Sequence, residues 1–343
     1  MTELHTTAQA LVANGKGILA ADETVHTVTK RLTPRTIEST PDSRSAYREM
    51  LFATPGISAF ISGVILQDET IHQVDSAGTP MPELLARQNL IAGIKVDAGA
   101  VPLAGWPGEM VTEGLDGLRD RLKDYRRIGA RFAKWRAVLA VSDTRPSRAC
   151  VLANAHALAR YGALCQEQDL VPIVEPEVLM DGAHTIDRCE QVTGEALHAL
   201  FDALVEHDVV LEGLLLKPNM VVPGAGCPRR ATVPEVAGAT VRCLRRHAPA
   251  ALPGIVFLSG GQDAVAATIH LNAINQMPSA GPWKLTFSYG RALQDEALAA
   301  WQGKSTNVEA GQQAFYHRAQ CTAAAAIGRY VPAMEETLVG AKG

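Results

Sequence analysis

The sequence lacks the features that mark membrane, secreted and nucleic-acid-binding proteins. Its 343 residues contain no apolar run of the ~18 residues that a membrane span needs, and residues 1–10 lack the basic start and apolar core of a secretory leader. No run of like charges stands out, and acidic residues outnumber basic ones by 36 to 32. We therefore expect a soluble, cytoplasmic protein with neither a nucleic-acid nor a membrane partner.

Spacings that hold a disulfide or a metal are also missing. The six cysteines are scattered, without a C-x-x-C pair or the close spacing of a small secreted domain, so we expect reduced thiols. The ten histidines show no H-x-H or H-E-x-x-H spacing that would place two of them on one face of a strand or helix. We therefore predict no metal site.

What the sequence does have is 47% hydrophobic residues, in short apolar runs that alternate with longer stretches of helical period. This alternation is typical of parallel β/α units. Eight runs have the length of a strand, and they lie at residues 17–21, 61–66, 92–96, 132–138, 171–178, 212–217, 255–259 and 284–289. Eight such units that close on one another predict an α/β protein with a TIM (β/α)8 barrel.

The segments between the runs favour helices, as Leu197, Leu200 and Leu204 show with their spacing of three and four. The chain is longer than the ~250 residues of a minimal barrel, so an N-terminal helix, a C-terminal helix and longer loops must take up the excess. No linker or repeat divides it. We predict a single domain over residues 1–330 and a loose tail over residues 331–343.

Charged residues lie within or at the ends of the predicted strands, where a parallel barrel is normally apolar. They are Asp22, Lys95, Lys134, Arg136, Glu175, Glu177 and Lys217. Side chains two residues apart on a strand share one face, and active sites of this fold lie at the carboxyl ends of the strands. Any single pair is equally compatible with a structural ion pair. The set as a whole favours an active site for an anionic substrate.

A buried lysine suits attack on a carbonyl group. Desolvation and a second nearby cation both lower the pKa of an ammonium group from ~10.4 and free the amine. Lys134 and Lys217 form a possible pair of this kind, and the pattern alone leaves open which is the nucleophile. Glu175 is able to move the protons of imine formation if burial holds its pKa above the usual value.

A second group of residues follows the last two predicted strands and is typical of an anion site. The group comprises Ser259, Gly260, Gly261, Ser288, Gly290 and Arg291. Glycines at a strand-to-helix turn let backbone N–H groups approach an anion, and the helix N-terminus and an arginine add positive potential. Barrels often bind phosphate after strands seven and eight. Ordinary glycine turns remain the alternative.

Two other functions compete with a lysine-dependent enzyme. Residues 15–20 (GKGILA) match the pattern G-x-G-x-x-A of a nicotinamide-dependent oxidoreductase, but a helical segment precedes them and a strand follows, which is the reverse of the required context. The other alternative is a catalytically silent barrel that serves as a scaffold. The many charged residues at the strand ends argue against a silent barrel.

Ten segments occur in an order that identifies a family: GKGILAADE, SGVILQDET, GIKVD, GLDGL, FAKWR, VPIVEPE, LLKPNMV, FLSGGQ, LNAIN and LTFSYGRALQ. From about residue 11 to residue 330 the chain resembles class I fructose-1,6-bisphosphate aldolase. The resemblance implies a metal-independent lyase that cleaves fructose 1,6-bisphosphate reversibly to dihydroxyacetone phosphate and glyceraldehyde 3-phosphate. It also implies phosphorylated ketose and triose substrates, a covalent Schiff base instead of a cofactor, and a homotetramer.

The resemblance assigns the catalytic roles. Lys217 in LLKPNM looks like the lysine that forms the Schiff base, and Glu175 resembles the acid and base of carbinolamine dehydration, with Glu177 in support. Asp22 resembles the group that handles the proton of the C4 hydroxyl. Lys134 resembles the cation that tunes its neighbours. The protonated imine draws electrons from the breaking C3–C4 bond, so an enamine forms instead of a free carbanion.

The resemblance also assigns substrate contacts. Ser259, Gly260, Gly261, Ser288, Gly290 and Arg291 resemble the pocket for the C1 phosphate. Lys95, Arg136 and Arg31 resemble contacts to the other phosphate and the sugar chain. Thr24 and Thr27 stand where the family commonly has serines, so their hydroxyls are expected to serve the distal phosphate.

The chain departs from the family at two places. His26 replaces a common glycine, and we expect it to be a solvated loop residue. The tail ends in VGAKG, without the terminal tyrosine with which animal members protonate the enamine. The sequence therefore leaves open which group protonates the enamine, and also the preference among fructose 1,6-bisphosphate, fructose 1-phosphate and sedoheptulose 1,7-bisphosphate.

Overall fold

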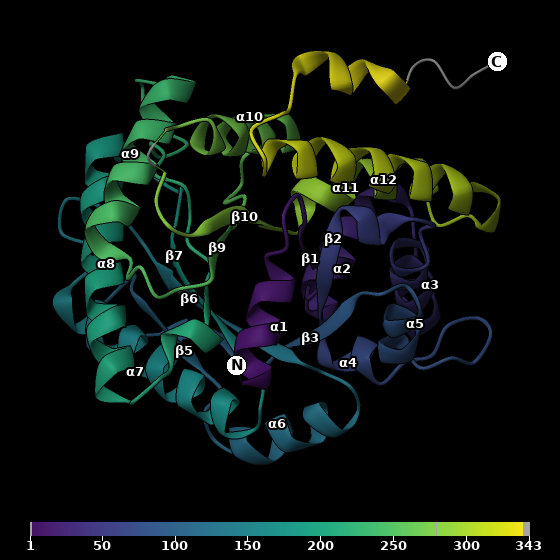
Figure 1. The fold of residues 1–343 in the computed structure, drawn as a ribbon, viewed down its shortest axis with the longest axis horizontal. Coiled ribbons are helices and arrows are strands. Elements are labelled where there is room, and N and C mark those ends of the chain that lie inside the picture. Colours follow the sequence, from purple (N-terminus) through teal and green to yellow (C-terminus); the bar gives the residue numbers. More distant parts are fainter. Residues whose placement is uncertain (1, 279, 339–343) are drawn as a thin grey trace.

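The computed structural model describes residues 2–278 and 280–338. Within these residues the barrel strands are β1 (Gly17–Ala20), β2 (Ile61–Leu66), β3 (Ile91–Lys95), β6 (Phe132–Leu139), β7 (Val171–Val178), β8 (Leu215–Leu216), β9 (Gly254–Phe257) and β10 (Lys284–Tyr289). They are parallel and form a closed barrel in the order β1-β10-β9-β8-β7-β6-β3-β2 (Figure 1). The predicted TIM barrel is confirmed.

Helices connect the strands and cover the outside of the barrel. The α-helices are α1 (Glu3–Leu11), α2 (Val25–Leu32), α3 (Pro41–Phe52), α4 (Asp68–Ile71), α5 (Met81–Arg87), α6 (Leu118–Arg127), α7 (Arg148–Glu167), α8 (Ile186–Glu206), α9 (Val233–His247), α10 (Ala264–Asn275), α11 (Arg291–Trp301) and α12 (Val308–Ala325). The short 3-10 helices are η1 (Thr33–Arg35), η2 (Ile57–Ala59), η3 (Leu211–Gly213), η4 (Ser305–Asn307) and η5 (Pro332–Leu338). None of the helices in residues 2–278 and 280–338 is both long and apolar enough to cross a membrane.

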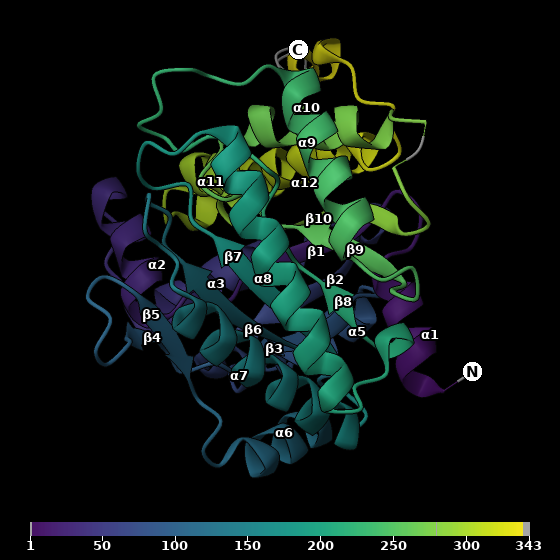
Figure 2. The ribbon, with the colours of Figure 1, turned by 90° about the vertical axis from the view of Figure 1, so that its left-hand side faces the viewer.

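Figure 2 shows α7, α8 and α9 side by side on one flank of the barrel. Each buries one face against the barrel, and Leu197, Leu200 and Leu204 of α8 are fully buried, as the spacing predicts. Each helix begins at a threonine or serine whose side chain accepts a hydrogen bond from a backbone N–H of the first turn. Local capping and an apolar stripe thus define these helices.

The inside of the barrel is apolar at the end where the strands begin. Phe132 of β6 fills much of this space, and a Cβ atom on Gly93 would lie 2.3 Å from its ring. Ala8 and Leu11 of α1 pack against the same cluster and close this end. Because this end is filled, the polar cavity of the barrel lies at the opposite end, where the strands finish.

The structure differs from the predicted strands on the last third of the barrel. The run at residues 212–217 contributes only Leu215–Leu216 to β8, because its first residues form η3. β9 ends at Phe257 instead of residue 259, and the chain then turns through Gly260 and Gly261 with φ of 58° and 83°. Positive φ ends a strand, and glycine adopts it without strain.

A hairpin of β4 (Gly99–Pro102) and β5 (Met110–Glu113) extends beyond β3 and was not predicted. Its strands are short and partly exposed, and β4 has Gly99 and Pro102 at its ends. They therefore lack the apolar run that signals a barrel strand. Thr112 of β5 connects the hairpin to β6 through a hydrogen bond to the Arg136 carbonyl.

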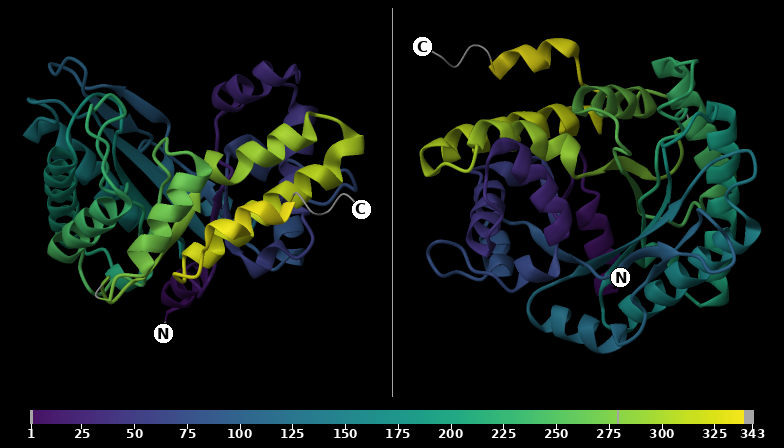
Figure 3. Two further views of the ribbon diagram at one scale, coloured as in Figure 1. Left: turned by 90° about the horizontal axis from the view of Figure 1, so that it is seen from above. Right: turned by 180° about the vertical axis from the view of Figure 1, so that it is seen from behind.

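The expectation of a loose tail is wrong for residues 332–338. They form η5 on the outer side of α12 (Figure 3). Glu335 pairs with the buried Arg318 of α12 and accepts a 2.8 Å hydrogen bond from the Tyr330 hydroxyl. A single acidic residue thus anchors the segment, which periodicity could not signal. Residues 339–343 of the predicted tail lie outside the described residues.

Candidate active site

A cavity of about 550 Å³ opens at the carboxyl ends of the barrel strands. All the residues that the sequence singled out for catalysis or substrate binding line it, namely Asp22, Thr24, Thr27, Arg31, Lys95, Lys134, Arg136, Glu175, Glu177, Lys217, Ser259, Gly260, Gly261, Ser288, Gly290 and Arg291. The fold therefore collects side chains that lie up to 269 positions apart in sequence, from Asp22 to Arg291. Their chemical roles stay predictions.

Glu175 lies at the centre of the charged cluster. Its Oε1 is 3.2 Å from Nζ of Lys217, and its Oε2 is 3.2 Å from Nζ of Lys134. Nζ of Lys134 is also 2.6 Å from Oδ2 of Asp22. Each of the two lysines and Glu175 is only 3% exposed. A chain of alternating charge thus runs from Asp22 through Lys134 and Glu175 to Lys217.

This alternation sets the protonation of Asp22 and Lys134. Burial alone would raise the pKa of Asp22, but the ammonium groups of Lys134 and Lys217 hold it well below its usual range. Burial would lower the pKa of Lys134, but the carboxylates of Asp22 and Glu175 hold it well above its usual range. Asp22 is thus an ionised acceptor, and Lys134 is a permanent cation.

The pKa of Glu175 corrects the prediction from sequence. The sequence tied the proton-transfer role of Glu175 to the condition that burial holds this pKa above the usual value. In the structure burial does act in that direction, but the ammonium groups of Lys134 and Lys217 lower the pKa of Glu175 below its usual value. The sequence placed charged residues at the barrel mouth without showing that both lysines contact the same carboxylate.

The next layer of the cavity contains two further ion pairs. Arg136 donates from Nε to the carboxylate of Glu177, and Nζ of Lys95 lies 2.7 Å from Oδ1 of Asp97. The backbone N–H of Arg136 also donates to Asp97. Each of the two cations is partly exposed to the cavity and held by a buried carboxylate. This arrangement fixes positive charge beside the central cluster.

The loops after β9 and β10 form a polar end of the cavity. The hydroxyl of Ser288 is buried and has no hydrogen-bond partner in the described part of the chain. Gly290 precedes α11, whose N-terminus has no side-chain cap, and the adjacent Arg291 is exposed. Free N–H groups, an unpartnered hydroxyl and a cation together favour an anion here.

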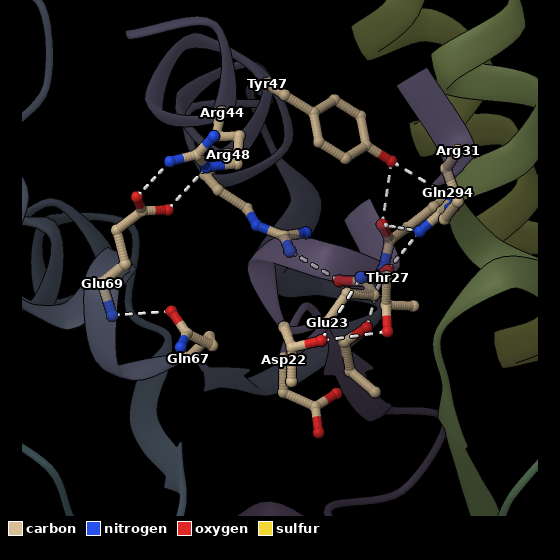
Figure 4. A network of polar contacts seen from close by, with 12 residues as sticks. Asp22, Glu23, Thr27, Arg31, Arg44, Tyr47, Arg48, Gln67, Glu69 and Gln294 are labelled. Atoms are coloured by element: carbon tan, nitrogen blue, oxygen red, sulfur yellow. Dashed lines mark hydrogen bonds and ion pairs between the residues drawn. The ribbon is translucent and has the colours of Figure 1, made fainter. Parts of the chain in front are cut away.

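The opposite end of the cavity is formed by α2. Thr24 caps this helix, and its hydroxyl lies 3.0 Å from that of Thr27. The terminal nitrogens of Arg31 donate to protein groups, among them Glu23 (Figure 4) and Asp295. Arg31 therefore contacts the cavity while its charge is already engaged by protein carboxylates. His26 lies in the exposed first turn of α2, not in the expected loop.

The chain matches the family described as "Fructose-bisphosphate aldolase class-I" over residues 3–342. It belongs to the class I fructose-bisphosphate aldolase family. It is 55% identical over 329 residues to the "Probable fructose-bisphosphate aldolase class 1" of Xylella fastidiosa, which covers 96% of this chain and 98% of the relative. It is 54% identical over 329 residues to "Fructose-bisphosphate aldolase B" of Gallus gallus, and this match covers 96% of this chain and 90% of the relative.

A solved structure agrees with this family. The aldolase of Plasmodium falciparum, solved in complex with TRAP and a small molecule inhibitor, superposes with a TM-score of 0.94 at 50% identity over 96% of this chain and 95% of that chain. Our chain is therefore a metal-independent lyase of the aldolase type. Residues 15–20 lead from a turn into β1 and do not open a helix, so they lack the context of a dinucleotide site.

Three further charged residues line the cavity of this aldolase and were not singled out from the sequence: Glu23, Lys30 and Asp97. Each stands within two positions of a residue that was, in the segments AADE, TKR and GIKVD. Proximity in sequence was the available signal. It fails to separate such residues from solvated neighbours, because only the path of the loop decides which side chain points inward.

Proposed function

We propose that this aldolase cleaves fructose 1,6-bisphosphate reversibly to dihydroxyacetone phosphate and glyceraldehyde 3-phosphate through an imine on Lys217. The observation that carries the proposal is the contact between Nζ of Lys217 and Oε1 of Glu175, at 3.2 Å in a buried site. A nucleophilic amine needs a group within reach that takes and returns protons. Glu175 is in that position.

Imine formation uses the pair of Lys217 and Glu175. The Lys217 ammonium transfers a proton to Glu175, and the free amine then attacks the C2 carbonyl of the substrate. Glu175 returns the proton to the carbinolamine hydroxyl, which leaves as water. The two neighbouring ammonium groups keep Glu175 ionised in the free enzyme, so its carboxylate is able to accept a proton. The transfer removes the Lys217 charge, which is one of the two charges that lower the pKa of Glu175.

Cleavage uses Asp22. Its ionised carboxylate accepts the proton of the C4 hydroxyl, the C3–C4 bond breaks, and its electrons pass to the imine nitrogen to give an enamine. Glyceraldehyde 3-phosphate leaves. Lys134, 2.6 Å from Asp22, stabilises the carboxylate before the transfer and remains charged throughout. Protonation of the enamine and hydrolysis of the imine then release dihydroxyacetone phosphate.

The two ends of the cavity suit the two phosphates. Ser259, Gly260, Gly261, Ser288, Gly290 and Arg291 are proposed to bind the C1 phosphate, supported by the unpartnered Ser288 hydroxyl and the uncapped start of α11. The hydroxyls of Thr24 and Thr27, with Lys95 and Arg136, are proposed to bind the other phosphate and the sugar chain. Glu177 supports this end by holding Arg136.

We further propose a cytoplasmic homotetramer. The location is supported by the six free cysteines, all buried as thiols, which suit a reducing compartment. The tetramer rests on the family alone. Light scattering on the purified protein tests it, and a monomeric mass at micromolar concentration would contradict it.

Borohydride trapping tests the proposed mechanism. Dihydroxyacetone phosphate and sodium borohydride should give a covalent adduct that peptide mass analysis locates on Lys217. Lys217→Met should abolish the adduct and turnover while the fold remains. No adduct in the wild-type protein, or an adduct on Lys134, would contradict the proposal, and a silent scaffold would form none. Cleavage rates on fructose 1,6-bisphosphate, fructose 1-phosphate and sedoheptulose 1,7-bisphosphate then establish the preferred substrate.

A further inference from the structure

Gln294 is a completely buried glutamine in the first turns of α11, where helices α2, α3 and α11 meet the end of β1 (Figure 4). It does not line the cavity, and none of the steps above uses it. A buried amide is costly unless its donors and acceptors are paired. Its bonding therefore shows what it holds in place.

The amide of Gln294 connects three segments of the chain. Nε2 donates to the Ala20 carbonyl at 2.6 Å, and Oε1 accepts from the Tyr47 hydroxyl at 2.8 Å and from the Arg31 guanidinium at 2.9 Å. Burial raises the pKa of Tyr47 to about 12, so its hydroxyl stays protonated and donates. With donors on one side and a carbonyl on the other, the amide has one orientation.

The same network holds the residue next to Asp22. Arg31 also donates to the Glu23 carboxylate, and Arg48 donates to its second oxygen at 2.6 Å. The turn from Ala20 to Glu23 is thus held at both ends, by Gln294 at the Ala20 carbonyl and by the two arginines at Glu23. Gln294 connects these two attachments through its bond to Arg31.

The start of α11 packs closely against the end of β1, where Gln294 bonds to the Ala20 carbonyl. The start of α11 approaches β1 so closely that a Cβ on Gly290 would lie 3.3 Å from the Ala20 oxygen. Asp22 follows two residues later, and its carboxylate lies 2.6 Å from Lys134 on the far side of the barrel mouth. The position of this carboxylate therefore depends on where Gln294 holds the end of β1.

We propose that Gln294 is a positioning residue for Asp22. Its amide fixes the turn of residues 20–23 against α11, so that the Asp22 carboxylate reaches the C4 hydroxyl of the bound sugar. This inference rests on the proposed function, in which Asp22 acts in carbon–carbon cleavage and not in imine formation. Lys217 and Glu175 lie on the β7–β8 side, and no hydrogen bond joins either to Gln294 in the described residues.

The inference predicts a split between two steps of the reaction. In Gln294→Met, which has a similar length and no polar atoms, cleavage of fructose 1,6-bisphosphate should lose between about tenfold and about 100-fold in kcat, as a misplaced catalytic group typically does. The rate at which borohydride traps dihydroxyacetone phosphate on Lys217 should stay at the wild-type value per folded molecule. A merely structural role would lower both rates in the same proportion.

Gln166→Met provides the matched control. Gln166 of α7 lies at the end of the barrel opposite the cavity and also makes three hydrogen bonds. Its Nε2 donates to the Val210 and Gly213 carbonyls, and its Oε1 accepts from the Val210 N–H. This variant should lose stability but keep both rates. If Gln294→Met does not fold, Gln294→Asn serves, because the shorter amide cannot reach Ala20 and Tyr47 together and should show the same split.

The outcomes separate this inference from the proposed function. A wild-type adduct on Lys217 together with wild-type kcat in Gln294→Met or Gln294→Asn would overturn the role of Gln294 alone. Equal losses of trapping and cleavage would also overturn it. The absence of an adduct in the wild-type protein would overturn the proposed function and this inference with it.

Discussion

The ammonium group of Lys134 lies 2.6 Å from the carboxylate of Asp22 at the mouth of the barrel, where Lys134 is buried and the Asp22 side chain is 13% exposed. Lys134 comes from the fourth strand of the barrel in sequence and Asp22 from the turn after the first. Each group keeps the other charged against the cost of burial.

Lys134→Met should damage both stability and activity. It leaves the buried carboxylates of Asp22 and Glu175 without the cation that they share, and removal of one partner from a buried ion pair typically costs about 3–5 kcal/mol. The pKa of both acids should rise, and kcat should fall by about 100-fold or more. Urea unfolding and steady-state kinetics measure these effects. Lys123→Met, at an exposed position of α6, should leave both unchanged.

The free energy of unfolding should depend on pH through the same cluster. The pKa values of Asp22 and Glu175 are lowered in the folded protein, so their contribution is present above the unfolded values of ~4 and is lost as pH falls through the folded values. The pKa of Lys134 is raised, so its contribution is present below ~10.4 and is lost as pH rises above it. In Asp22→Asn the loss of stability on the acid side should be smaller. An equal acid-side loss of stability in Asp22→Asn and in the wild-type protein would contradict the contribution assigned to Asp22.

Ser288→Ala should weaken substrate binding without destabilising the protein. The Ser288 hydroxyl has no hydrogen-bond partner among the described residues, so its removal breaks no bond within the fold. KM for fructose 1,6-bisphosphate should rise about tenfold, the effect of one lost charge-assisted hydrogen bond. Ser62→Ala is the control, because its buried hydroxyl donates to the Gly17 carbonyl at 2.9 Å. It should lower stability by about 1 kcal/mol and leave KM unchanged.

Glu335→Ala should release η5 without affecting turnover. Glu335 pairs with the buried Arg318 and accepts from Tyr330, so its loss should cost about 1–3 kcal/mol locally. Amide hydrogen exchange of residues 332–338 should accelerate, whereas kcat should not change because η5 lies on the outer side of α12. The exposed Glu336→Ala should alter neither. A fall in kcat would show that the docked segment supports catalysis.

Cleavage should survive excess EDTA. In the proposed mechanism the protonated imine on Lys217 accepts the electrons of the breaking bond, so no Lewis acid is needed to polarise the carbonyl. The measurement is the cleavage rate before and after chelation and dialysis. Loss of activity that zinc restores would overturn the Schiff-base mechanism for this chain.

The candidate site was predictable because the position of a residue along a barrel strand determines where its side chain lies in the barrel. Charged residues within or at the ends of neighbouring parallel strands lie near the mouth of the barrel, so the positions of Lys134 on β6, Glu175 on β7 and Lys217 after β8 predicted one shared site but not their contacts. The choice of Lys217 over Lys134 came from the LLKPNM segment and not from spacing. The hairpin of β4 and β5 and the anchored η5 escaped because no periodic signal marks them.

By itself the sequence determined the eight parallel strands and many of the charged residues around the cavity, because apolar period and strand-end charge are local signals. The family followed from the ten ordered segments. Only the tertiary structure decided the protonation of the site. The direction of the pKa shift of Glu175 depends on its contacts with two ammonium groups that lie 83 positions apart in the chain, at Lys134 and Lys217. The buried amide of Gln294, which connects β1 to α2 and α3, likewise has a meaning only where those segments meet.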